Sequence, residues 1–153
     1  MRLPSVDGSN LELRVLGYQF PDGYEISGKR VYPDWLNVEG WVHTDAFEWT
    51  FAYPSLTADE AVRLGDWLES VARGRPVKQR LEFTEPNITL SLDDVDARSA
   101  LIRVNFSQEA CPPGESREVR LGDGYPVEIR VQLNQIGEAA AAWRREIRSF
   151  PPR

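Results

Sequence analysis

The stretch Trp35–Tyr53, WLNVEGWVHTDAFEWTFAY, decides the fold. In its first half, one side of an extended chain carries Leu36, Val38 and Val42, while the other carries Trp35, Asn37, Glu39, Trp41 and His43. In its second half one face collects four aromatic residues, Phe47, Trp49, Phe51 and Tyr53. A period of two is typical of β-strands. The connection Thr44–Ala46 predicts a three-residue hairpin loop, so the stretch indicates two neighbouring antiparallel strands.

Further segments on both sides of this hairpin show the same alternation. They are Leu11–Val15, Leu81–Phe83, Ile88–Leu92, Leu101–Phe106 and Val127–Leu133. The residues Asp93–Asp96 predict an acidic turn, and Ala110–Tyr125 predicts mostly loop.

Two segments have the three-and-four spacing of amphipathic helices. The first begins at Thr57, where Glu60 completes a capping box, and it stops at Gly74. The second is predicted to be capped by Asn134 and to end before Pro151. Mostly sequential strands with two helices predict an α+β single domain over residues 1–153. We expect a mostly antiparallel sheet of about six to eight strands with both helices packed on it, and residues 1–10 as a loosely held segment.

The charge balance disfavours nucleic acid as a partner. The chain has 24 acidic and 18 basic residues, a formal net charge of −6, and its arginines are scattered along the sequence. Phosphate attraction needs a basic face. Residues 1–76 hold 12 acidic and seven basic residues, so the acidity lies mainly in the aromatic half. We also expect a cytoplasmic protein, because no signal peptide, no membrane span and only one cysteine, Cys111, are present.

The sequence contains few residues for catalysis. His43 is the only histidine, so we expect no catalytic triad, no metal site and no cofactor. A Cys111–His43 dyad is conceivable, but nothing in the sequence supports it. Glu85 and Glu109 flank predicted strand ends and could form the carboxylate pair of a glycosidase. With 24 acidic residues, a chance pair is also expected.

The outer side of the Trp35–His43 strand is the candidate surface for a partner. Trp35 and Trp41 share it with Glu39 and His43. Two interpretations stay open: the Gly17–Pro33 segment covers these tryptophans, which we favour, or they form an exposed binding patch.

Several short motifs together resemble the WapI-like immunity family of bacteria. They are Leu13–Pro21 (LRVLGYQFP), Asp34–Leu36 (DWL), Pro54–Thr57 (PSLT), Asp66–Leu68 (DWL), Phe83–Asn87 (FTEPN) and Phe150–Arg153 (FPPR). One departure from the family pattern is Tyr32–Asp34 before Trp35-Leu36, where Asp-Ala-Asn is expected. The resemblance implies a small cytoplasmic antidote to the nuclease toxin of a contact-dependent inhibition system.

The leading hypothesis from the sequence is a non-enzymatic binder that neutralises a cognate secreted toxin. Its partner-binding residues would be Trp35, Glu39, Trp41, His43 and Glu85. Two alternatives remain: a hydrolase or glycan-handling enzyme that uses Glu85 and Glu109, and an orphan structural domain.

Overall fold

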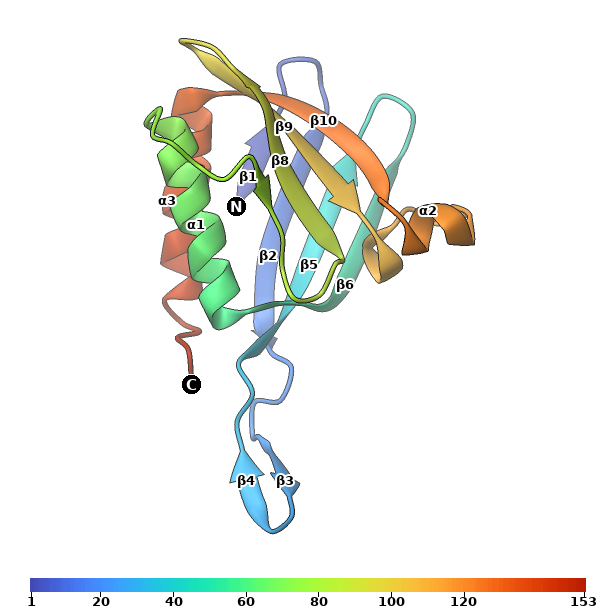
Figure 1. Cartoon of the computed structure of the whole chain (residues 1–153), viewed down its shortest axis with the longest axis vertical. Coiled ribbons are helices and arrows are strands. Elements are labelled where there is room, and N and C mark those ends of the chain that lie inside the picture. The colour runs from blue at the N-terminus through green and yellow to red at the C-terminus, as the bar shows by residue number, and fades with distance from the viewer.

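A computed structural model describes all residues of the chain, Met1–Arg153. Eight of its strands form two four-stranded antiparallel sheets (Figure 1). The first has the order β1-β2-β5-β6, with β1 Arg2–Pro4, β2 Asn10–Tyr18, β5 Trp35–His43 and β6 Glu48–Thr57. The second has the order β10-β9-β8-β7, with β7 Arg80–Leu81, β8 Ile88–Val95, β9 Ser99–Phe106 and β10 Tyr125–Gln132. The third sheet is a hairpin of β3 Tyr24–Ile26 and β4 Lys29–Val31.

The helices are α1 Ala58–Ala72, the short α2 Arg117–Leu121 and α3 Leu133–Ile147. The predicted α+β class is confirmed, with ten strands in three sheets rather than six to eight in one. The additional strands β1, β3 and β4 have three residues each, which is too short for an alternation to be recognised. None of the helices is long and apolar enough to span a membrane.

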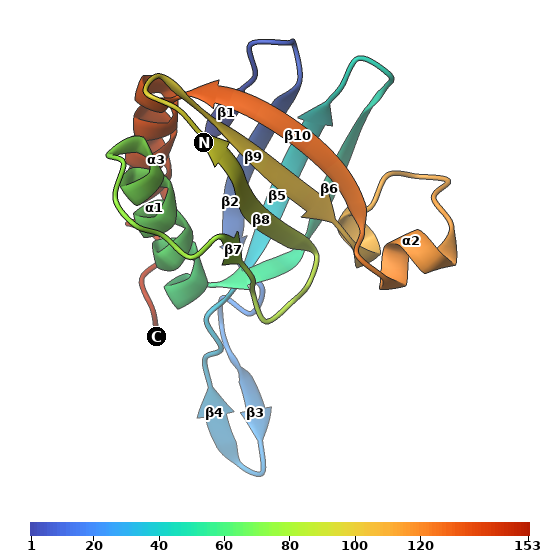
Figure 2. The ribbon, with the colours of Figure 1, turned by 45° about the horizontal axis from the view of Figure 1, so that its top comes forward.

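The two large sheets lie one in front of the other, and α1 and α3 run side by side along one edge of them (Figures 1 and 2). The two sheets and the helices α1 and α3 together enclose one core of 33 buried residues. The predicted alternation of β5 is confirmed, because Leu36, Val38 and Val42 are buried and every odd-numbered residue is half-buried. Across the core, the Trp49 ring of β6 packs edge-on against Phe106 of β9, with 5.3 Å between ring centroids.

The capping box of α1 is confirmed, and it has a second use. Thr57 Oγ1 accepts a hydrogen bond from Glu60 N at 3.2 Å, and Glu60 Oε2 accepts one from Thr57 N at 3.0 Å. The other carboxylate oxygen, Oε1, accepts from the amide and the hydroxyl of Thr84, both at 2.8 Å. Glu60 therefore also connects α1 to the segment before β8.

Three predicted local features are wrong. The helix α3 begins at Leu133 with Gln132 as its N-cap, not at Asn134, because the carbonyl of Arg98 accepts the bond from the Leu133 amide at 2.8 Å. Of the predicted acidic turn, Asp93, Asp94 and Val95 belong to β8, and only Asp96 lies in the turn. The hairpin after β5 has a four-residue connection, Thr44–Phe47, instead of three residues.

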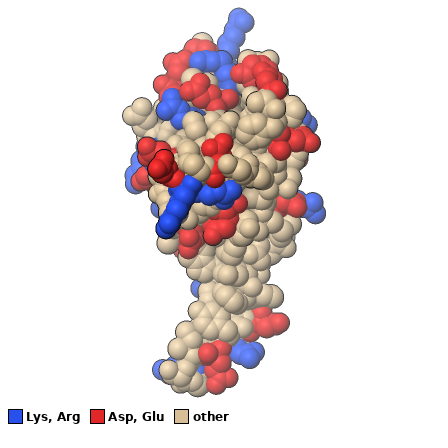
Figure 3. Space-filling model, turned by 90° about the vertical axis from the view of Figure 1, so that its right-hand side faces the viewer, with Lys and Arg blue, Asp and Glu red and all other residues tan.

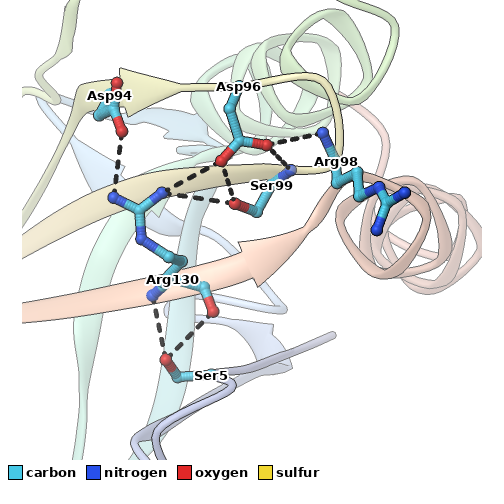
Figure 4. Close-up of polar contacts among 6 residues, drawn as sticks. All are labelled: Ser5, Asp94, Asp96, Arg98, Ser99 and Arg130. Carbon is cyan, nitrogen blue, oxygen red and sulfur yellow. Dashed lines mark hydrogen bonds and ion pairs between the residues drawn. The ribbon is translucent and has the colours of Figure 1, made fainter.

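Arg130 of β10 connects three parts of the molecule (Figure 4). Its guanidinium lies 3.1 Å from Asp94 and 3.6 Å from Asp96. Its backbone donates to and accepts from the Ser5 hydroxyl, at 3.0 and 3.1 Å. Residues 1–10 are expected to be loosely held; in the structure β1 pairs with β2, Leu3 is completely buried, and Ser5 joins the first sheet to β10.

The favoured interpretation, in which the Gly17–Pro33 segment covers the outer face of β5, is wrong. Gly17 and Tyr18 belong to β2 and pair with β5, and the rest of the segment extends away from the sheets, with β3 and β4 paired only with each other (Figures 1 and 2). Ser27 and Gly28, between these strands, both have positive φ angles, of 50° and 76°. Two successive positive φ angles are the geometry of a tight hairpin turn whose twist matches the strands. We call residues 20–33 the arm.

Candidate functional site

The five predicted partner-binding residues occupy two separate places. Glu39 and Trp41 line a shallow hollow on the outer face of the first sheet, together with Glu12 and Arg14 of β2. His43 stacks on Trp41, with ring centroids 5.8 Å apart and planes 17° from parallel. Its Nδ1 lies 3.5 Å from Glu48 Oε2, without the geometry of a hydrogen bond. We call this surface the outer β5 face.

Trp35 and Glu85 meet elsewhere, in an open hollow at the start of β5. The hollow is lined by Gln19, Trp35, Tyr53, Pro54, Glu85, Asn87 and Glu109. We call it the Trp35 hollow. Its wall is rigid at Asn87, which is 3% exposed, donates to the Ser55 hydroxyl at 3.5 Å and accepts from the amide of Ser107 at 2.9 Å. The structure thus brings Trp35 and Glu85 together but separates them from Glu39, Trp41 and His43.

The tryptophans divide into structural and accessible ones. Trp49, Trp67 and Trp143 are buried, and each donates its indole N–H to a backbone carbonyl: Ala110 at 3.0 Å, Lys78 at 2.8 Å and Ala61 at 2.7 Å. Trp35 and Trp41 are half-buried and make no such bond. An aromatic ring with an unused N–H donor at the surface is typical of a binding anchor.

Glu85 and Glu109 line the same hollow, as the hydrolase alternative requires. Both side chains are nevertheless exposed. A carboxyl that acts as a general acid near neutral pH is held in an apolar, enclosed environment. Glu85 and Glu109 therefore lie in one hollow, but they lack the apolar, enclosed environment that acid–base catalysis needs.

A Cys111–His43 dyad finds no support in the structure. Cys111 is 4% exposed, and burial raises the pKa of its thiol, whereas a nucleophilic cysteine needs a lowered pKa. His43 contacts Trp41 and Glu48 instead. No group of three or more His, Cys, Asp or Glu side chains is arranged to hold a metal ion.

Two surface features escaped the sequence reasoning. The arm exposes three large apolar side chains, those of Tyr24, Ile26 and Tyr32. The sequence feature that could have predicted this hairpin is the Ser27-Gly28 pair, which follows the short alternation of Tyr24 and Ile26. Four arginines, Arg73, Arg144, Arg145 and Arg148, line a hollow between α1 and α3, where Glu69 pairs with Arg73 and Arg144. On the side that carries α2, charges of both signs are interspersed (Figure 3).

The comparison with known proteins gives one match. The model of the Immunity protein WapI-like family matches residues 2–151. No curated protein and no solved structure matches the chain.

Proposed function

Because the chain belongs to the WapI-like immunity protein family, we propose that it binds and neutralises a cognate toxin by direct association, without catalysis. The single observation that carries this proposal is the family match over residues 2–151. The proposed toxin is a secreted nuclease delivered by contact-dependent inhibition. The proposal includes a cytoplasmic location, where an immunity protein would meet a toxin that has entered its cell.

We assign the toxin contact to the Trp35 hollow and the outer β5 face. Both combine an accessible indole, of Trp35 or Trp41, with carboxylates such as Glu85 or Glu39. Aromatic anchors surrounded by polar groups carry most of the binding energy in protein interfaces.

The charge of the chain supports a nuclease as the partner. Residues 1–76 have a net charge of −5, and they include all of β5 and the arm. A nuclease must hold phosphates and therefore presents a basic cleft. Opposite potentials accelerate association and weaken with added salt.

The test is calorimetric titration of the chain with a toxin domain encoded next to its gene, inactivated at the catalytic residue of that domain. We expect a 1:1 complex at about 50 mM salt that is weaker at about 150 mM salt. Trp35→Ala should weaken binding at least about tenfold, because a central aromatic anchor is lost. The matched control is Phe47→Ala, which removes another partly exposed aromatic ring, at the opposite end of the β5–β6 hairpin. Absence of binding at both salt concentrations would contradict the proposal.

The convergence of Glu85 and Glu109 in one hollow favours a hydrolase as the second candidate. It predicts turnover of a chromogenic glycoside or an oligosaccharide that Glu85→Gln and Glu109→Gln each abolish. Our proposal predicts that the wild type turns over these substrates no faster than a variant that carries both Glu85→Gln and Glu109→Gln.

A further inference from the structure

The arm is an element that the core of the protein does not need. None of its residues belongs to the buried core, and its strands pair with no other strand. An isolated two-stranded hairpin is marginally stable in water. A hairpin that projects from the sheets therefore indicates a function other than stabilising the core.

The two faces of the arm differ in character. Tyr24 pairs with Val31, and Ile26 pairs with Lys29, so these four side chains share one face. On the other face Glu25 pairs with Arg30. Tyr24 and Ile26 are 38% and 51% exposed, which leaves the apolar face in water.

The base of the arm is held in place. The amide of Gln19 donates to the Trp35 carbonyl at 2.8 Å. From the other side, Arg153 donates to the carbonyls of Phe20 and Pro21 at 3.2 and 3.3 Å, and its guanidinium lies 3.4 Å above the Tyr18 ring. A presentation element anchored in this way loses less conformational freedom on binding than a free loop.

The arm is continuous with the Trp35 hollow. Gln19 precedes the arm and Trp35 follows it, and both line that hollow beside Glu85 and Glu109. The arm itself is electrically balanced, since Asp22 and Glu25 offset Lys29 and Arg30. An apolar projection thus rises from a carboxylate-bearing base, which is complementary to an apolar recess with a basic rim.

We infer that the apolar face of the arm inserts into the nucleic-acid cleft of the toxin, while the carboxylates at its base meet the basic rim of that cleft. The inference rests on the proposed function and names the element that enters the partner. Clefts that hold a single strand often contain stacking platforms for bases, onto which Tyr24 can stack. The arm has no excess of basic residues, which argues against its binding nucleic acid directly.

The test compares Tyr24→Ser/Ile26→Ser with the matched double variant Val62→Ser/Val95→Ser, whose side chains are 42% and 48% exposed on α1 and β8. The probe is the inactivated toxin domain from the neighbouring gene. We expect the arm variant to weaken binding at least about tenfold and the control to stay within about twofold of the wild type. Unfolding free energies of both variants equal to that of the wild type will show that the fold is intact.

Hydrogen exchange supplies a second measurement. In the wild-type complex, we expect the amides of residues 24–31 to become protected. If the wild type binds but the arm variant binds equally well, or the arm amides stay unprotected, the inference is wrong and the proposed function stands. If sedimentation shows that the arm variant only loses self-association, the arm contacts a second copy and the inference is again wrong. If the wild type does not bind, the proposed function itself fails.

Discussion

At the residue scale, Gly40 shows how closely the core is packed. It lies in the middle of β5 and pairs with Phe51, whose ring covers it. A Cβ atom on residue 40 would lie 2.2 Å from two atoms of that ring, which itself is buried against Phe106. A side chain at position 40 must therefore displace a core aromatic ring.

Gly40→Ala is expected to lower the free energy of unfolding by about 1–3 kcal/mol, the usual cost of overpacking a core. Urea denaturation measures it. The control is Gly137→Ala in α3, where a Cβ would meet only Ala72 Cβ at 3.7 Å. That control should be neutral or stabilising by up to about 1 kcal/mol, because alanine favours a helix over glycine. Equal stability of Gly40→Ala and the wild type would contradict the described packing.

Glu60 is a second residue whose role exceeds its local motif. Glu60→Ala removes the acceptor for Thr57 N and for both donors of Thr84. We expect a loss of about 2–3 kcal/mol, since hydrogen bonds to a charged group are broken and partly buried donors lose their partner. The neighbouring Asp59→Ala, at an exposed site, should cost less than about 1 kcal/mol. Thermal unfolding of the Glu60→Ala and Asp59→Ala variants measures both losses of stability. Similar losses in the two variants would show that the contact between Glu60 and Thr84 contributes nothing.

At the element scale, the β8–β9 turn depends on an ionised carboxylate. The backbone amides of Arg98 and Ser99 donate to Asp96, as does the Ser99 hydroxyl, and Arg130 lies nearby (Figure 4). These donors, the Arg98 amide first, hold the pKa of Asp96 below its usual value of 3.8. A lowered pKa in the folded state means that ionised Asp96 stabilises the fold.

This stabilisation should be complete above pH 3.8 and disappear as the pH falls through the lower pKa of folded Asp96. Asp96→Asn should therefore lower the melting temperature at neutral pH, and the difference from the wild type should shrink at lower pH. Asp45→Asn, in the β5–β6 connection, is the control and should differ little at any pH. A difference for Asp96→Asn that does not depend on pH would contradict this role.

Also at the element scale, the outcome of sequence prediction follows the range of the interactions. The alternation of β5 and the capping box at Thr57 are set by neighbouring residues, and both predictions are confirmed. The start of α3 at Leu133 is set by Arg98, 35 positions earlier in the chain, and the prediction of Asn134 as its N-cap is wrong because no local pattern reveals that contact.

At the scale of the whole molecule, the range of the interactions also explains why the sequence did not predict which residues of the site lie together. The convergence of Trp35 with Glu85 and Glu109 depends on how the two sheets face each other, as does the link from Ser5 to Arg130. The direction of the arm was predicted wrongly, because apolar residues within a segment do not tell whether it folds back or projects. The net charge of −6 likewise does not show where charges of one sign lie in space. In this acidic chain, four arginines line one hollow.

The central claim is that this chain neutralises a toxin by binding it. The most direct measurement titrates the nuclease activity of the active toxin domain from the neighbouring gene with increasing amounts of the chain. We predict a linear loss of activity that ends at one equivalent, with Trp35→Ala shifted to higher concentrations. Full nuclease activity in the presence of a large excess of the folded chain would contradict the account.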